Sequence, residues 1–428
     1  MGILIPVAII FFTCLAIWRA CDGFETASEY IGKDLSEGVR GGTINAISSS
    51  LPELFTTLIA LFVLDNTDGF SVGIGTTAGS ALFNGMIIPA ACIFTVVGTV
   101  VLGTRVASVN VSTKVLLRDG LSLIFCEAIL IVLINGNALH WWQGLILMLL
   151  YVAYLTYMLT SMTSDNADEE DEGDEEDQDE EEEARGVIGT LFYWLSGGPA
   201  LDLERFFIRE KQAEQIKNNT WNGWPLLICS ATVIGLACFA LVKACEWLGT
   251  GPGNETHASY SLFGYTFAGF GIPTMFVAVI FASMATSVPD TVISIRDAKD
   301  GDYDDAVANA LGSNIFDICF ALGFPLFVYT LLNGSITLSP AVAAQSAELR
   351  FLLLCLTVIG FIIYMFGKRR VQPNGTPYVE MKRGKATLLA LLYFLFAGYI
   401  LGLSFEYAWA ESISNSVQGI LEFIPKIG

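Results

Sequence analysis

Stretches of about twenty consecutive apolar residues recur along this 428-residue chain, and they constrain its fold more than any other feature. An α-helix of that length spans the hydrocarbon core of a bilayer. Hydrophobic residues make up 53% of the sequence, which is more than in an ordinary soluble domain. The stretches lie at residues 2–20, 43–64, 71–100, 117–135, 140–162, 222–247, 268–295, 304–332, 350–367 and 386–404. The sequence therefore predicts an all-α integral membrane protein with ten transmembrane helices.

The positions of Lys and Arg predict how these helices are oriented. Of the 22 Lys and Arg residues, 19 fall in the connections that follow the first, third, fifth, seventh and ninth apolar stretch. The other side of the membrane holds only Lys243, Arg350 and Lys426. Basic connections stay in the cytoplasm, so both termini are expected outside. The regular alternation also supports the number ten, because a missed helix would scramble it.

One acidic segment accounts for most of the formal net charge of −21. Residues 165–183 contain 15 Asp and Glu and no Lys or Arg. Such a run cannot bury apolar area, which predicts a solvated, disordered cytoplasmic linker. A weak calcium-collecting or regulatory loop is the alternative. Residues 201–219, which follow it, have the pattern of an amphipathic helix at the membrane surface.

The two halves on either side of this segment resemble each other. "SSSLPE" at residues 48–53 corresponds to "ATSVPD" at 285–290, and "GTTAGSALFNG" at 75–85 corresponds to "NALGSNIFDIC" at 309–319. With five helices in each half, the second half must enter the membrane from the opposite side, as in the inverted repeats of many secondary transporters. The predicted organisation is a first five-helix repeat (1–162), an acidic cytoplasmic loop with the surface helix (163–221), a second five-helix repeat (222–404) and an external C-terminal tail (405–428).

Four of the predicted membrane helices carry a hydroxyl residue and, four positions later, a carboxylate or amide residue. Residues four apart lie on the same face of a helix, so each helix presents two oxygen-bearing side chains together. The pairs are Ser49 with Glu53, Ser80 with Asn84, Thr286 with Asp290, and Ser313 with Asp317. The helix breakers Pro52 and Pro289 stand next to the two acids of the repeated motif.

These residues predict a buried cation site. Each proline leaves a backbone carbonyl without its helical donor, and in lipid that carbonyl needs another partner. Ser and Thr often bond to their own helix, and proline kinks or a single membrane Asn such as Asn84 can have a structural role. Three buried carboxylates are different, because each costs several kcal/mol unless it is neutralised. Oxygen ligands without His or Cys suit Na⁺ or Ca²⁺.

At these motifs the sequence resembles the sodium/calcium exchanger, or calcium:cation antiporter, superfamily. The resemblance implies coupled Na⁺ entry and Ca²⁺ exit, with the first and sixth helices sliding against the others. It also implies central calcium ligands at Glu53 and Asp290, flanked by Asn84 and Asp317. The sodium ligands that it implies, together with nearby carbonyls, are Ser49, Ser50, Ser80, Thr286, Ser287 and Ser313.

The sequence departs from the family motif at one position in each half. The glycine that opens the motif is replaced by Ser48 and by Ala285, which bears on the local carbonyl geometry and the ion preference. The Glu53, Asn84, Asp290 and Asp317 set resembles the potassium-dependent branch and some prokaryotic members most, so K⁺ is a candidate third ion.

Other functions leave parts of the pattern unexplained. A cation channel could use the same ligands, but paired broken helices in inverted repeats favour alternating access. An intramembrane enzyme would use Asp290 and Asp317 and leave Glu53 and Asn84 without a role. A Ca²⁺/H⁺ or other cation/H⁺ antiporter remains the main alternative, because a buried carboxylate can exchange a metal for a proton. We expect no cofactor and no nucleic-acid partner. The oligomeric state is left open.

Overall fold

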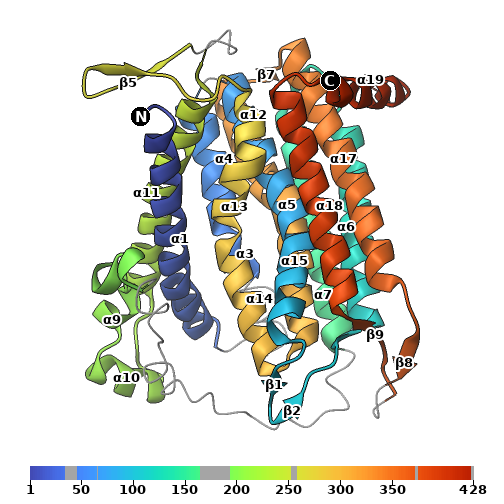
Figure 1. Ribbon diagram of the computed structural model, residues 1–428. Helices are drawn as coiled ribbons and strands as arrows, with labels where there is room; N and C mark the ends of the chain where they lie inside the picture. The colour runs from blue at the N-terminus through green and yellow to red at the C-terminus, as the bar shows by residue number, and fades with distance from the viewer. Residues whose placement is uncertain (34–45, 65, 164–192, 252–257, 372–374, 426–428) are drawn as a thin grey trace.

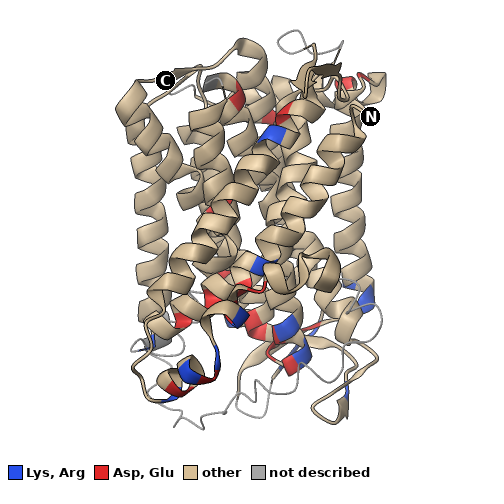
Figure 2. Ribbon diagram, turned by 90° about the vertical axis from the view of Figure 1, so that its left-hand side faces the viewer, with Lys and Arg blue, Asp and Glu red and all other residues tan. Residues whose placement is uncertain are grey.

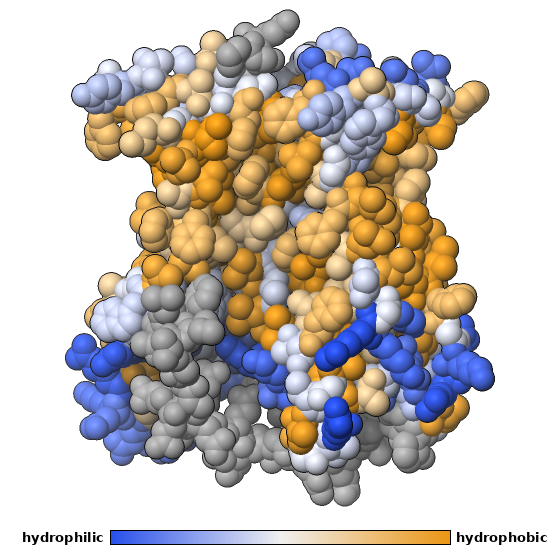
Figure 3. All heavy atoms as spheres, viewed as in Figure 1, coloured by the Kyte–Doolittle hydropathy of each residue, from blue (hydrophilic) through white to orange (hydrophobic). Residues whose placement is uncertain are grey.

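The computed structural model describes residues 1–33, 46–64, 66–163, 193–251, 258–371 and 375–425. The described helices form one bundle of roughly parallel and antiparallel rods, with the N- and C-termini at the same end (Figure 1). The predicted acidic segment, residues 165–183, lies outside the described residues. Figure 3 shows an apolar band around the bundle with hydrophilic residues at both ends, as expected for a protein that crosses a bilayer.

Each of the ten apolar stretches contains one continuous or interrupted helix. The continuous helices are α1 (Leu4–Ile31), α5 (Asn66–Val96), α6 (Thr113–Leu133), α7 (Trp141–Thr163), α11 (Trp224–Gly249), α17 (Pro340–Met365) and α18 (Arg383–Ser404). Three stretches contain interrupted helices: α3 (Ala46–Ser49) with α4 (Leu51–Val63); α12 (Thr274–Val277), η3 (Ala278–Ala282), α13 (Ser283–Thr286) and α14 (Val288–Asp300); and α15 (Tyr303–Phe316), η4 (Asp317–Ala321) and α16 (Gly323–Asn333). Both η3 and η4 are π-helical turns.

Not all of these helices are long and apolar enough to span a bilayer by themselves. Seven meet that condition among the described residues, and the pair bent by 43° between Thr286 and Val288 makes an eighth. The helix α4 has only 13 residues. The helix α6 has 21 residues, but it carries the charged side chains Lys114, Arg118, Asp119 and Glu127.

The buried apolar residues form two large clusters that divide the bundle. One is built on α1 and α11 and includes Ile17, Leu241 and Leu248. The other extends over α5, α6, α7, α15, α17 and α18. Figure 1 shows α1 and α11 side by side at one edge of the bundle. Their separate core means that this pair is packed mainly on itself and on the broken helices beside it.

Short β-ladders join several helix connections, which the all-α prediction did not include. The pairs are β1 (Val100–Val101) with β2 (Thr104–Arg105), β4 (Ala138–Leu139) with β7 (Ile336–Thr337), and β5 (Tyr260–Leu262) with β6 (Tyr265–Phe267). A three-stranded sheet has the order β3 (Val109–Ser112), β9 (Pro377–Met381), β8 (Arg369–Val371), with Val111 opposite Val379. Strands of two to five residues are too short to leave a clear period in the sequence.

The regions outside the main helices also differ from the prediction. In place of one amphipathic helix at residues 201–219, the chain forms two short helices, α9 (Leu203–Phe207) and α10 (Glu210–Lys217). The C-terminal tail contains a further helix, α19 (Ala408–Leu421), which lies across the ends of α17 and α18 (Figure 1). Most of the Lys and Arg residues lie at the end of the bundle away from the termini (Figure 2).

A candidate cation site in the core of the bundle

Two broken helices place the repeated acids in the interior. The helix α4 starts after Ser50, whose φ and ψ are −94° and 5°, and α14 starts after Ser287, whose φ and ψ are −81° and 3°. Pro52 and Pro289 lie in the first turn of these helices. A backbone N–H in that turn has no acceptor within its own helix, so a proline is tolerated there. Glu53 and Asp290 lie in the same first turns, which favour negative charge because of the helix dipole.

Ser80 is the centre of one group of oxygens. Its Oγ lies 3.0 Å from Glu53 Oε1, 3.0 Å from Asp317 Oδ2 and 2.8 Å from Ser287 Oγ. A hydroxyl carries only one proton, so Ser80 can donate to only one of these oxygens at a time. The remaining oxygens need a proton or a cation between them. Glu53 and Asp317 therefore reach the same point from opposite halves of the chain.

Asp290 is the centre of a neighbouring group. Its Oδ2 accepts from Asn84 Nδ2 at 2.9 Å, and its Oδ1 accepts from Ser313 Oγ at 2.8 Å. Ser49 also interacts with this carboxylate. The Asn84 amide lies 3.4 Å from Ser80 Oγ as well, which joins the two groups. The paired motifs of the two halves thus form one continuous cluster.

All ten predicted cation-site side chains are completely buried, but several of their oxygens have no partner. The exposed fraction is 0% for Ser49, Ser50, Glu53, Ser80, Asn84, Thr286, Ser287, Asp290, Ser313 and Asp317. Glu53 Oε2, Asp317 Oδ1, Asn84 Oδ1 and Ser50 Oγ lack a hydrogen bond of good geometry among the described residues, although Ser50 interacts with Asp317 and Thr286 interacts with Glu53. Buried oxygens are normally satisfied, so this concentration of acceptors is an exception, and a cation is one partner that could satisfy them.

The three carboxylates also lack a positively charged neighbour. Among the described residues, no Lys or Arg forms an ion pair with Glu53, Asp290 or Asp317. Nor do three acidic, His or Cys side chains in the described part of the chain gather closely enough to hold a metal by themselves. Hydroxyl, amide and carbonyl oxygens would have to complete the coordination. Such mixed oxygen sets suit Na⁺ and Ca²⁺.

Two of the predicted hydroxyl residues also bond to their own helices. Thr286 Oγ1 donates to the carbonyls of Ala282 and Ser283, at 3.1 and 3.2 Å. Ser49 Oγ donates to the carbonyl of Ala46 at 3.3 Å. Back-bonding of this kind is common for Ser and Thr in membrane helices, and it leaves the oxygen lone pairs free to bind a cation.

Close backbone contact brings α5 against the broken second-half helix. An added Cβ at Gly79 would lie 2.3 Å from the carbonyl oxygen of Val279 and 2.8 Å from Ser283 Cβ. A Cβ at Gly75 would lie 2.6 Å from the carbonyl oxygen of Met275. Glycine is therefore required at these positions. The close approach at Gly79 is what lets the next residue, Ser80, reach Ser287 on the other half.

Other polar residues extend the cluster and were not predicted. Asn314 Nδ2 donates to the carbonyl of Ala81 at 2.9 Å, and Asn309 Nδ2 lies 3.1 Å from Ser294 Oγ. Thr76 Oγ1 is buried without a partner. Thr76 and Asn309 lie four positions before Ser80 and Ser313, so the same four-residue spacing, followed one turn further, would have found them. The sequence gives no comparable signal for Asn314.

Comparison with known proteins agrees with this architecture. The family model described as "Sodium/calcium exchanger protein" matches residues 5–160 and 222–402. The chain is 26% identical to human sodium/potassium/calcium exchanger 5 over 91% of this chain and 82% of that protein. It is 41% identical to human sodium/potassium/calcium exchanger 3, but only over 34% of this chain and 21% of that protein.

Among solved structures, the chain resembles the H⁺/Ca²⁺ exchanger CAX, with a TM-score of 0.55 and 14% identity, over 97% of this chain and 92% of the other. This likeness concerns the fold. The family model, in contrast, matches most of the sequence on both sides of the acidic segment. The chain therefore belongs to the sodium/calcium exchanger family of multi-pass membrane proteins.

Proposed function

We propose that this protein is a secondary active antiporter that exchanges Na⁺ for Ca²⁺ across a membrane. The observation that carries this proposal is the buried oxygen cluster, in which three carboxylates meet without a Lys or Arg counter-ion among the described residues. Charges in such a place are stable only when cations neutralise them. The relatives named as sodium/potassium/calcium exchangers support the same ions.

In this proposal the ligands divide between the two ions. Glu53 and Asp290 bind Ca²⁺ at the centre, and Asn84 and Asp317 flank them. The hydroxyls of Ser49, Ser50, Ser80, Thr286, Ser287 and Ser313 bind Na⁺ or support the acids. Because Ser80 contacts Glu53, Asp317 and Ser287 together, Na⁺ and Ca²⁺ would compete for overlapping oxygens, which is what coupled exchange requires.

The proposed architecture is ten membrane spans in two inverted five-helix repeats, residues 1–162 and 222–404. The equivalent breaks before α4 and α14, each with a proline in the first turn, support it. Both termini would face outside, and the acidic loop would face the cytoplasm. The concentration of Lys and Arg at the end opposite the termini supports that orientation (Figure 2).

Alternating access requires one part of the protein to move while the ligands stay largely in place. The pair α1 and α11 is suited to this role because it has its own apolar core. We propose that this pair slides against the remaining helices and opens the cluster to one side at a time. The thiol of Cys238 on α11, 3.5 Å from the carbonyl of Pro52, is a direct contact between the moving pair and a broken helix.

A third ion follows from the charge balance. Three carboxylates with one Ca²⁺ leave about one negative charge unbalanced, and a monovalent cation would neutralise it. We propose K⁺ for this role, with a proton on Asp317 as the alternative. Asp317 Oδ1 has no partner among the described residues, so it can accept either one.

The test is ⁴⁵Ca²⁺ flux into proteoliposomes that contain the purified protein, with Na⁺, K⁺ and H⁺ gradients varied one at a time. We expect an outward Na⁺ gradient to drive Ca²⁺ uptake, and collapse of that gradient to stop it. Uptake driven by a pH gradient without Na⁺ would instead identify a Ca²⁺/H⁺ antiporter. Downhill Ca²⁺ flux without any counter-ion would identify a channel. Either result would reject sodium–calcium exchange.

A further inference from the structure

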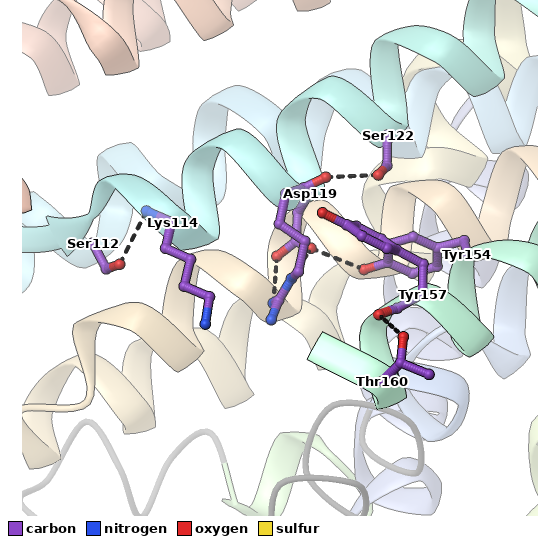
Figure 4. A network of polar contacts seen from close by, with 8 residues as sticks. Ser112, Lys114, Asp119, Ser122, Tyr154, Tyr157 and Thr160 are labelled. Carbon is purple, nitrogen blue, oxygen red and sulfur yellow. Dashed lines mark hydrogen bonds and ion pairs between the residues drawn. The ribbon is translucent and has the colours of Figure 1, made fainter. Parts of the chain in front are cut away.

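Three carboxylates outside the cation site are buried among the described residues: Asp119 and Glu127 on α6 and Glu348 on α17. Two of them are fully paired. Asp119 accepts two bonds from Arg118, at 2.7 and 2.9 Å, and one from the Tyr154 hydroxyl at 3.2 Å (Figure 4). Glu348 accepts from the Tyr399 hydroxyl, from Ser414 Oγ at 2.6 Å and from Gln418 Nε2 at 3.1 Å.

Glu127 has no such environment. Its side chain is 0% exposed, its Oε1 accepts one bond from Thr357 Oγ1 at 2.8 Å, and its Oε2 has no partner among the described residues. Arg350 is also buried, two turns before Thr357 on α17, but it forms no ion pair with Glu127 in the described structure. An ionised carboxylate with one hydrogen bond and no cation is costly in a membrane interior.

The other titratable groups around Glu127 do not supply a positive charge. They are the thiols of Cys126 on the same helix, Cys319 on η4 and Cys355 on α17. From α7, Tyr154 is already bonded to Asp119. The acids of α15, Asp304 and Asp305, lie in its first turn, far along the helix from η4. Because none of these described side chains supplies a positive charge, a bound proton is the partner that can neutralise Glu127.

Thr357 can form a hydrogen bond with Glu127 in both the ionised and the protonated state of the carboxyl group. A hydroxyl can donate to an ionised carboxylate, and it can accept from a protonated one. Thr357 also lines a cavity of about 20 Å³ between α5, α6, α15 and α17, and Asn314 lines the same cavity. That volume exceeds the roughly 10–15 Å³ that one water molecule needs, and Asn314, Thr357 and Tyr364 are the polar residues of a lining that is otherwise apolar. Asn314 Oδ1 is a buried acceptor without a partner among the described residues.

We propose that Glu127 and Thr357 form a proton-binding site, separate from the cation site and linked to it through this cavity and Asn314. Binding adds one proton to the carboxylate and removes one negative charge from the membrane interior, and no other bond changes. The link is short, because Asn314 follows Ser313 in the chain and donates to the carbonyl of Ala81, which follows Ser80. The proton site itself does not depend on which cations are exchanged, whereas its effect on transport rests on the proposed function.

Infrared spectroscopy of the full-length protein in phosphatidylcholine vesicles tests the site directly. At neutral pH, Glu127→Gln should remove one protonated-carboxyl band from the spectrum. The matched control Glu348→Gln should leave that band in place, because the Glu348 carboxylate already accepts hydrogen bonds from Tyr399, Ser414 and Gln418. Thr357→Val should shift the frequency of the band, and Thr357→Ser should restore it. A spectrum of Glu127→Gln identical to that of wild type would overturn the proposal.

Transport tests the link to the cation site. We expect the maximal rate of Na⁺-driven ⁴⁵Ca²⁺ flux to change at alkaline pH in wild type and in Glu348→Gln, as Glu127 loses its proton. In Glu127→Gln that alkaline change should disappear, while KM for Ca²⁺ follows the wild-type value at each pH. Equal pH profiles in all three proteins would reject the link. Absence of Na⁺-driven flux in wild type would refute the exchange function and leave the infrared result to be judged separately.

Discussion

At the scale of single residues, the proposed cation site depends most on the positions of Glu53 and Asp290. Each lies one residue after a proline, in the first turn of a helix that begins inside the protein. Each is completely buried without a Lys or Arg partner among the described residues. Burying two such charges is costly, and in the proposed function a bound cation offsets that cost.

Replacing Glu53 by Gln, or Asp290 by Asn, keeps the size of the side chain and removes one charge from the proposed calcium site. Loss of a close charge in a low-dielectric site costs about 3 kcal/mol or more, so we expect at least ~100-fold weaker Na⁺-driven flux. The measurement is ⁴⁵Ca²⁺ uptake at matched protein levels. Near-normal uptake by a well-expressed Glu53→Gln protein would show that the acid is not a calcium ligand.

Asp317→Asn tests the third ion, because its counterpart in the other repeat is the neutral Asn84. If K⁺ is transported, wild type should require K⁺ and the variant should not. If a proton takes that role, wild type should ignore K⁺, its calcium affinity should fall as the pH falls, and the variant should lose part of that dependence. Wild-type flux indifferent to both K⁺ and pH would contradict both versions.

The four-residue spacing of hydroxyl and acid residues predicted the members of the cluster, but not their contacts. That Ser80 touches Glu53, Asp317 and Ser287 at once depends on how three helices pack, which no local pattern encodes. Asn314 was missed for the same reason, since its partner is the carbonyl of Ala81 on another helix.

At the scale of elements, α4 and α14 each begin one residue before the predicted helix breakers Pro52 and Pro289, because a proline cannot donate a hydrogen bond to the preceding turn. The π-helical turns η3 and η4 were not predicted, because each adjusts a helix to the backbone packed against it. The helix α17 begins at Pro340, ten residues before the predicted start. The hydrophobic pattern did not predict this first part because it contains the polar residues Gln345, Ser346 and Glu348.

Gly79→Ala should disturb the cation site through the backbone contact between α5 and η3. The added Cβ would lie 2.3 Å from the carbonyl oxygen of Val279, and nothing lies within 4 Å of a Cβ at Gly235 on α11. Overpacking of this kind costs roughly 1–3 kcal/mol, so we expect about tenfold slower flux and a lower melting temperature. Gly235→Ala is the matched control and should behave as wild type. Full activity of Gly79→Ala would contradict the close contact.

At the scale of the whole molecule, the hydrophobic pattern predicted an all-α membrane protein. The apolar stretches predicted the helices, since hydrophobic length is set by the bilayer rather than by partner helices. The separate core of α1 and α11 could not be predicted, because it depends on which helices are neighbours in space. The same holds for the sheet in which Val111 is opposite Val379, residues from the two halves of the chain.

The proposed orientation places residue 172 in the cytoplasm and residue 428 outside. In a background without the nine native cysteines, Glu172→Cys and Gly428→Cys should react with a membrane-impermeant maleimide from opposite sides. Accessibility is read by labelling sealed, oriented vesicles before and after permeabilisation. Reaction of both positions from the same side would contradict the ten-span topology.

The central claim is that Na⁺ and Ca²⁺ bind alternately to one buried oxygen cluster. Equilibrium ⁴⁵Ca²⁺ binding to the purified protein, with Na⁺ added stepwise, tests it most directly. We predict that Na⁺ displaces the bound Ca²⁺ completely, and that Asp290→Asn weakens Ca²⁺ binding by about 100-fold. Ca²⁺ that stays bound at saturating Na⁺, or that binds Asp290→Asn as tightly as wild type, would contradict the claim.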